Sequence, residues 1–178
     1  MLLGYQLIGR RYEHRFDVIL RQMRCSAFFV TIEFMIGGYL VLKYIREYGN
    51  PFVKIALRCP AVNMAEVLTK SIMKNDELDL IRRGKNVQVG FDRKIEVNNQ
   101  FLIDLEEGDI RKSDYIDFAE DILILHGTKD EVVPFDAGKQ FADDNLIEFI
   151  PVENADHRFQ NPACMEIATK AVLEFFGF

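Results

Sequence analysis

Residues 121–134 read DILILHGTKDEVVP. The aliphatic run at residues 122–125 predicts a strand that is buried on both faces, as in a parallel sheet covered by helices. His126 and Gly127 end that strand, and the polar loop after them contains Asp130. Because open parallel sheets bind their ligands at the carboxyl ends of the strands, this loop is a candidate position for functional residues.

Three other segments have the composition of strands. Apolar, β-branched and aromatic residues dominate residues 27–34, 53–57 and 147–151, and helical patterns separate these segments. Such alternation predicts an α/β fold with a mostly parallel sheet flanked by helices. We expect the strands to lie side by side in chain order, joined by right-handed crossovers.

The covering helices are predicted by apolar residues that recur every three or four positions. We expect these helices at residues 12–23, 39–48, 135–143 and 162–176. The last of them is amphipathic, as is typical of a helix that packs one face on a sheet.

Between the second and third predicted strands, residues 61–115 differ in character. Charged residues dominate this stretch and the apolar ones are scattered. We interpret it as a cap-like insertion of short helices within a single domain of residues 1–178. A hairpin that pairs residues 87–91 with residues 94–97 is also expected.

The composition is that of a packed globular protein, and it limits the partners. Of 178 residues, 49% are apolar and 28% are charged, with a formal net charge of −6. An acidic chain argues against nucleic acid or an anionic membrane surface as a partner, and no apolar run reaches the roughly 20 residues of a membrane span.

Three cysteines without a CxxC pair support neither a disulfide framework nor a zinc knuckle. The absence of a signal-peptide pattern predicts a cytoplasmic protein.

Two candidate catalytic residues follow neighbouring strands. Asp130 comes after the strand at residues 122–125, and His157 comes after the strand at residues 147–151, within the sequence NADHRF. A histidine base needs a carboxylate that fixes its tautomer and stabilises its protonated form. The alternative role of Asp130 is to cap the following helix. We expect His126 to bridge the loop backbone near Asp130.

Several motifs, in this order, resemble the C-terminal part of an α/β-hydrolase of the serine esterase and acyl-peptidase kind. They are GGYLVLKY from residue 37, then ALRCPAVN, ILILHGTKDEVVP, PVENADHRF and the closing LEFF. The resemblance runs from about residue 27 to the C-terminus and places residues 61–115 where this fold carries a variable cap. Its chain order of nucleophile, acid and histidine implies that Asp130 is the acid and His157 the base.

The chain departs from the α/β-hydrolase pattern at the nucleophile. The turn before the helix normally reads G-x-S-x-G, whereas this chain, aligned on Gly37, reads EFMIGG over residues 33–38. Met35 therefore occupies the nucleophile position, and a thioether cannot form an acyl-enzyme. Glu33 occupies the position of the first glycine of this pattern, which normally relieves crowding before the nucleophile. The resemblance implies that the Ile36 backbone N–H is one oxyanion donor.

Other expectations follow from the same comparison. Only 34 residues precede Met35, so we expect an N-terminally truncated α/β-hydrolase without the early strands and the His-Gly loop of the oxyanion hole. The strand at residues 27–34 would then form an exposed sheet edge and allow self-association. We expect no cofactor and no metal, because neither a Gly-rich phosphate loop nor a metal-ligand cluster is visible. The missing GxGxxG motif also argues against a Rossmann domain.

Two functions remain as hypotheses. The first is a serine-type hydrolase of carboxylic esters or small acyl amides, with a small-molecule ester or acyl substrate and an activity impaired by Met35. The second is a non-catalytic α/β-hydrolase remnant, or a small-molecule binding module that uses the former acyl pocket. Cys59 follows the second strand but does not occupy the nucleophile position, so we do not expect it to replace the serine.

Overall fold

The computed structural model describes residues 29–32, 35–90 and 94–178. The helix predicted at residues 12–23 lies outside this part of the chain, as do both ends of the strand predicted at residues 27–34. The predictions for those residues therefore stay predictions.

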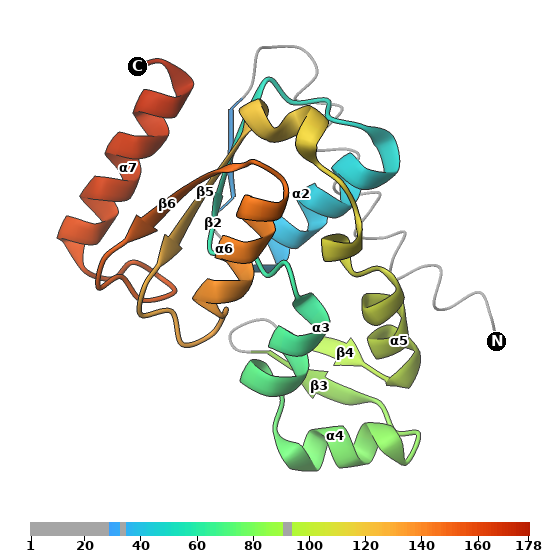
Figure 1. Cartoon of the computed structure of the whole chain (residues 1–178). Coiled ribbons are helices and arrows are strands. Elements are labelled where there is room, and N and C mark those ends of the chain that lie inside the picture. The colour runs from blue at the N-terminus through green and yellow to red at the C-terminus, as the bar shows by residue number, and fades with distance from the viewer. Residues whose placement is uncertain (1–28, 33–34, 91–93) are drawn as a thin grey trace.

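A four-stranded parallel sheet forms the centre of the described residues (Figure 1). Its strands lie in the order β1 (Phe29–Ile32), β2 (Lys54–Arg58), β5 (Ile122–Gly127) and β6 (Glu148–Val152). Each strand pairs in parallel with its neighbour. The α/β class and the predicted spatial order of the strands are confirmed.

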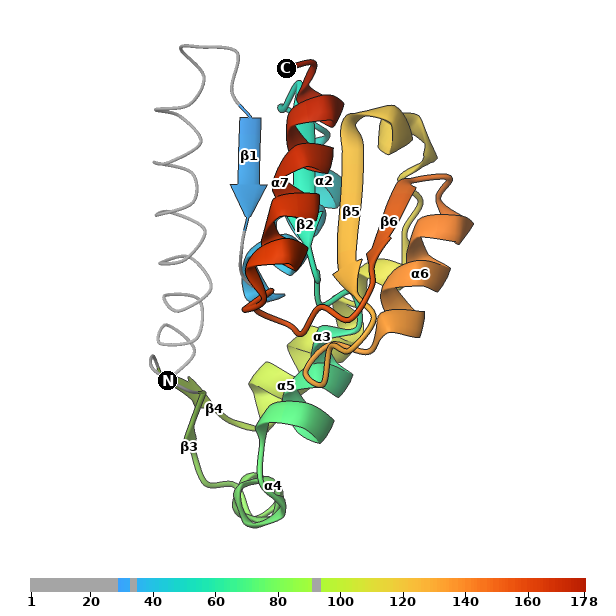
Figure 2. The same cartoon turned by 90° about the vertical axis from the view of Figure 1, so that its left-hand side faces the viewer.

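Within the described part of the chain, three helices cover the two faces of this sheet. α2 (Met35–Tyr48) and α6 (Phe135–Asp144) lie on one face, and α7 (Pro162–Phe176) lies on the other (Figures 1 and 2). The Asn161 side chain caps the start of α7, and Gly177 ends it in the left-handed conformation. Among the described helices, none is long and apolar enough to span a membrane.

The side chains of β5 alternate between two apolar cores. Ile122 and Ile124 pack into a core that includes buried residues of α2 and α6, whereas Leu123 and Leu125 pack into a second core with residues of α7. Every residue of β5 is buried. Cover on both faces explains why this strand reads as an unbroken apolar run rather than as an alternating one.

Short elements connect β2 to β5. They are α3 (Met64–Glu66), the π-helix η1 (Val67–Ile72), α4 (Asn75–Arg82), β3 (Val87–Val89), β4 (Ile95–Val97), α5 (Asn99–Glu107), and the 3-10 helices η2 (Ile110–Lys112) and η3 (Ile116–Asp121). β3 and β4 form an antiparallel hairpin, as predicted. Figure 2 shows α3, α4, α5 and the hairpin beyond the carboxyl ends of the sheet strands.

Candidate active site

The loops that follow β5 and β6 lie against each other at the carboxyl edge of the sheet. Backbone hydrogen bonds join them, from Thr128 N–H to the Val152 carbonyl (3.1 Å) and from Lys129 N–H to the Ala155 carbonyl (3.0 Å). Gly127 allows this approach, because a Cβ atom at that position would lie 2.3 Å from the Ala155 carbonyl oxygen. The two loops therefore bring residues 27 positions apart in sequence into contact.

Asp130 and His157 meet between these loops. His157 Nδ1 lies 2.8 Å from Asp130 Oδ2, which is within the hydrogen-bond distance that the sequence predicted. The Asp130 side chain is fully buried, and the His157 side chain is 19% exposed. The structure thus places an imidazole at the surface with a buried carboxylate behind it.

The backbone also holds the Asp130 carboxylate. Its Oδ1 atom accepts hydrogen bonds from the N–H groups of Val132 and Val133, each at 2.8 Å. These residues belong to the loop before α6, so Asp130 orders its own loop and does not cap the helix. Burial alone would raise the pKa of Asp130, but hydrogen bonds from His126, His157 and Val133 hold that pKa well below its ordinary range.

The His157 loop is ordered by its own contacts. The Asp156 side chain accepts a hydrogen bond from the Gln160 N–H at 2.8 Å. Asn154 and Phe159 have positive φ angles of 61° and 52°, so the chain turns sharply on both sides of the histidine. These turns present His157 toward Asp130 and leave its second ring nitrogen as the one available for a reactant.

Met35, which the sequence analysis aligned with the nucleophile of the α/β-hydrolase pattern, lies at the start of α2. Met35 is the first residue of this helix, and β1 runs in parallel with β2, so α2 begins at the same edge of the sheet as the two loops. Gly38 lies close to Pro60, because a Cβ atom at Gly38 would be 2.8 Å from the Pro60 Cβ. Ile36, in the first turn, is 38% exposed. Its N–H is one of the first four of the helix, which have no partner within the helix.

Cys59, directly after β2, and His126, on β5, lie beside Asp130, and the sequence analysis did not predict the proximity of Cys59. Both residues are fully buried. Burial and the neighbouring Asp130 carboxylate raise the pKa of the Cys59 thiol, which opposes formation of the thiolate that a nucleophile requires. The raised pKa supports the expectation that Cys59 does not replace the serine, which stays a prediction.

His126 bridges the loop as expected. Its Nε2 atom lies 3.1 Å from the Val133 carbonyl oxygen and also 3.4 Å from Asp130 Oδ2. The second contact was not predicted. The only sequence signal for it is the spacing of four residues between His126 and Asp130 across a tight loop.

Among the described residues, Cys59, His126 and Asp130 are close enough together to be considered as metal ligands. One donor atom each of Cys59, His126 and Asp130 lies within 4.8 Å of the other two. Metal ligation would require a Cys59 thiolate and free carboxylate oxygens on Asp130. Burial disfavours the first, and N–H groups already occupy the second. We therefore interpret the cluster as a hydrogen-bond network around Asp130.

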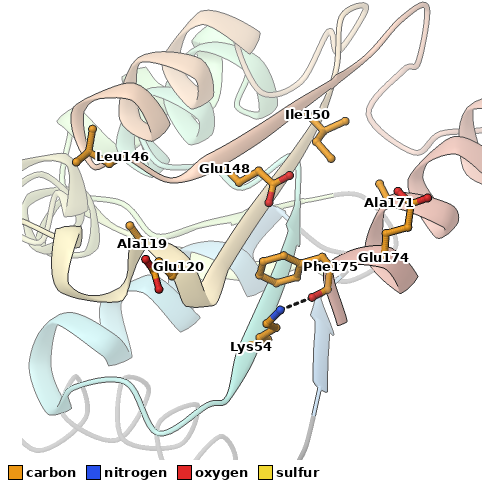
Figure 3. Close-up of a pocket in the computed structure, with 9 residues that line it drawn as sticks. All are labelled: Lys54, Ala119, Glu120, Leu146, Glu148, Ile150, Ala171, Glu174 and Phe175. Atoms are coloured by element: carbon orange, nitrogen blue, oxygen red, sulfur yellow. Dashed lines mark hydrogen bonds between the residues drawn. The ribbon is translucent and has the colours of Figure 1, made fainter. Parts of the chain in front are cut away.

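Two cavities lie elsewhere. One, of about 550 Å³, opens near the amino ends of β2 and β6, beside the C-terminal part of α7 (Figure 3). The other, of about 660 Å³, lies between η1, α4 and α5. Neither Asp130 nor His157 is among the described residues that line them.

The fold is that of the α/β-hydrolases. No protein-family model and no curated protein matches the sequence. Solved structures do match. They include a candidate hydrolase from Agrobacterium vitis S4, with a TM-score of 0.66, 15% identity, 88% coverage of this chain and 64% of that chain. Mouse alpha/beta hydrolase domain-containing protein 10 has a TM-score of 0.62 and 15% identity, over 90% of this chain and 67% of that one.

A third similar structure is the monoacylglycerol lipase of Paleococcus ferrophilus. Its TM-score is 0.56 with 14% identity, and the match covers 91% of this chain and 72% of the lipase. The chain therefore spans less than two thirds of the Agrobacterium protein and about two thirds to three quarters of the other two. The resemblance stated from sequence motifs is confirmed at the level of the fold.

Proposed function

We propose that this chain carries the acid–base pair of a serine-type hydrolase that acts on carboxylic esters or small acyl amides, and that its turnover is impaired at the nucleophile position. The observation that carries the proposal is the 2.8 Å contact between His157 Nδ1 and Asp130 Oδ2. The contact lies at the carboxyl edge of a sheet with the α/β-hydrolase fold, where such sheets bind ligands.

In this proposal His157 is the general base. Because Asp130 accepts a hydrogen bond from Nδ1, the proton of the neutral ring resides there and Nε2 can accept a proton from the attacking group. The buried carboxylate then stabilises the imidazolium that forms. General-base catalysis of this kind contributes roughly 10²–10⁴-fold to a rate.

Covalent catalysis is the part that we propose to be impaired. Met35 begins α2, at the position that the α/β-hydrolase pattern gives to serine. A thioether sulfur has no proton for His157 to remove, so no acyl-enzyme forms there. The Ile36 N–H, free of an intrahelical partner at the start of α2, is the proposed oxyanion donor.

The substrate class is proposed from the fold and from the chemistry of the pair. One similar structure is a monoacylglycerol lipase, whose substrate is a carboxylic ester. A histidine base with a buried carboxylate serves hydrolysis of esters and of acyl amides alike. We therefore propose a small-molecule ester or acyl compound as the substrate.

Met35 itself favours a second function. A protein that keeps the pair and the fold without a nucleophile can bind an acyl compound without cleaving it. The alternative is therefore a non-catalytic small-molecule binding module.

Covalent labelling with a fluorophosphonate probe separates the two functions. The unmodified chain should not react, and its hydrolysis of p-nitrophenyl acetate should be no faster than that of the His157→Ala variant. The Met35→Ser variant should recover little turnover, because Glu33 stands where the pattern has glycine, but it should be labelled slowly at position 35. Combining Met35→Ser with His157→Ala should abolish the labelling.

The matched control is Lys129→Ala, an exposed neighbour of Asp130 outside the pair. In the Met35→Ser background, this change should leave the labelling rate unaltered. Labelling that does not depend on His157, or none at all in a folded Met35→Ser variant, would favour the binding module. Rapid His157-dependent turnover by the unmodified chain would instead require a nucleophile other than residue 35.

A further inference from the structure

We propose that His126 is a positioning residue that fixes the Asp130 carboxylate for His157, and that Gly138 on α6 keeps the His126 ring in place. The inference rests on the proposed function, in which His157 is the base. It extends the Asp130–His157 pair into the interior of the fold, to a residue on β5 and a residue on a covering helix.

The contacts of His126 define its tautomer. Its Nε2 atom faces two acceptors, the Val133 carbonyl oxygen at 3.1 Å and Asp130 Oδ2 at 3.4 Å. An unprotonated nitrogen would have no favourable interaction with either oxygen, so the ring proton resides on Nε2. Nδ1 is fully buried and has no hydrogen-bond partner among the described residues. His126 is therefore a fixed donor toward the loop.

The Asp130 carboxylate is consequently held from several directions. Two backbone N–H groups bind Oδ1, and the two imidazoles of His126 and His157 share Oδ2. Among the described residues, three titratable groups face Asp130: His126 from β5, His157 from the loop after β6, and Cys59 from the end of β2. Any rotation of the carboxylate away from His157 would break the contact with His126 as well.

The ring of His126 is itself confined. Phe135 and Phe149 pack around it, with ring centroids 5.6 Å and 6.2 Å from that of His126. Gly138 lies against the Nδ1 edge of the ring, since a Cβ atom there would lie 2.6 Å from His126 Nδ1 and 3.1 Å from Cε1. A larger residue at this position would push against the ring, and a displaced ring would lose its contact with Asp130.

Nuclear magnetic resonance of the imidazole nitrogens tests the proposal on the whole chain. The sequence has only three histidines, so the ring signals of ¹⁵N-labelled protein can be assigned by substitution. In the unmodified chain, we expect the His126 proton on Nε2 and a downfield Nδ1 proton for His157, as a strong hydrogen bond to a carboxylate produces.

Three variants separate positioning from packing. His126→Phe fills the space but removes the donor, and it should move the His157 Nδ1 proton upfield and broaden it. His126→Gln keeps a donor at the same distance along the side chain, and it should restore the signal. Gly138→Ala should act as His126→Phe does, although it does not contact Asp130. Gln140→Ala, an exposed change on the same helix, is the control and should leave the signal unaltered.

The outcomes decide the proposal. It is overturned if His126 carries its proton on Nδ1, or if the His157 signal is unchanged in a folded His126→Phe or Gly138→Ala variant. A downfield movement would also overturn it, because it would mean that His126 competes with His157 for Oδ2. If His126→Phe does not fold, the proposal is still decided by the His126 tautomer in the unmodified chain and by the His157 signal in Gly138→Ala. None of these signals requires hydrolysis, so failure of the proposed function would be recognised separately.

Discussion

At Asp130, hydrogen-bond donors converge on a carboxylate whose side chain is fully buried. Burial opposes the charge, and the donors more than compensate for it, so the pKa of Asp130 is lower in the folded state than in the unfolded state. A carboxyl with a depressed folded pKa stabilises the fold above its unfolded pKa of about 3.9, and this contribution is lost as the pH falls through the folded pKa. Asp130 therefore links stability to pH.

The Asp130→Asn variant should show this linkage. We expect the free energy of unfolding at pH 7 to fall by about 2 kcal/mol, because hydrogen bonds to a buried charge are lost. The deficit should shrink as the pH drops below about 4, where the unmodified chain begins to lose the same contribution. Urea unfolding at pH 7 and at pH 3 measures both differences. Glu131→Gln, an exposed neighbour, should show no such pH dependence, and an equal deficit at both pH values for Asp130→Asn would contradict the argument.

The sequence predicted that Asp130 and His157 form a pair, but it did not predict the other residues that contact Asp130. Asp130 and His157 could be predicted because each follows a recognisable strand, and parallel neighbours end at the same edge. Cys59 could not be placed beside Asp130 from the sequence. That contact depends on β2 pairing with β5 and on a positive φ angle of 45° at Cys59, and no short sequence motif encodes either.

At the scale of the elements, the loops that follow β5 and β6 approach each other closely through their backbones. Gly127 ends β5 at the point where the Ala155 carbonyl crosses it. A Cβ atom at a distance of 2.3 Å from a backbone oxygen cannot be accommodated by a change of side-chain rotamer, so the loops would have to separate. The contact between Asp130 and His157 thus depends on a residue outside the pair.

The Gly127→Ala variant tests this dependence. It should lower the free energy of unfolding by about 1–3 kcal/mol, the usual cost of overpacking, and should weaken the His157 Nδ1 proton signal. Chemical unfolding and the imidazole spectrum measure the two effects. Gly84→Ala is the comparison, since a Cβ atom there meets nothing within 4 Å and the cost comes only from its positive φ angle of 76°. Gly84→Ala should leave the histidine signal unchanged, and an unchanged signal in Gly127→Ala would refute the proposed role of this glycine.

Element boundaries were predicted less well than element types. α6 and α7 begin at the predicted residues, where Pro134 and Asn161 precede a clear periodic pattern. α2 begins at Met35, four residues before the predicted start, because Gly37 and Gly38 were interpreted as part of the turn. Glycine lowers helix propensity, but at Gly38 the close approach to Pro60 leaves no space for a side chain, and tertiary packing decides. The π-helix η1 has no sequence signal that we could use.

For the whole molecule, the predicted strand order was correct because each strand differs from the intervening segments in composition. The arrangement of residues 61–115 was not predictable, since the elements there are short and their buried apolar residues belong to a core shared with α2 and β5. Val67, Ile81 and Val97 are buried in that core, although they are far apart in the sequence. Whether residues 61–115 act as a cap over the pair stays a prediction.

The two ends of the described sheet differ in their capacity for association. β6 is protected, because Pro151 has no N–H to donate and Glu148 places an exposed charge on the strand. β1 reads FVTI and pairs with β2 on one side, from Phe29 opposite Lys54 to Ile32 opposite Leu57. Among the described residues, no strand pairs with its other side.

We therefore expect the chain to self-associate through β1 rather than through β6. An apolar edge strand offers a row of unpaired N–H and C=O groups to a second copy, and lysine on such an edge is a common barrier to pairing. Size-exclusion chromatography with light scattering should give a mass above the 20.7 kDa of one chain, rising with concentration. Thr31→Lys should shift the mass toward the monomer, whereas Glu148→Lys on the opposite edge should not. A concentration-independent monomer with a sharp thermal transition would mean that the free side of β1 is already covered within a single chain.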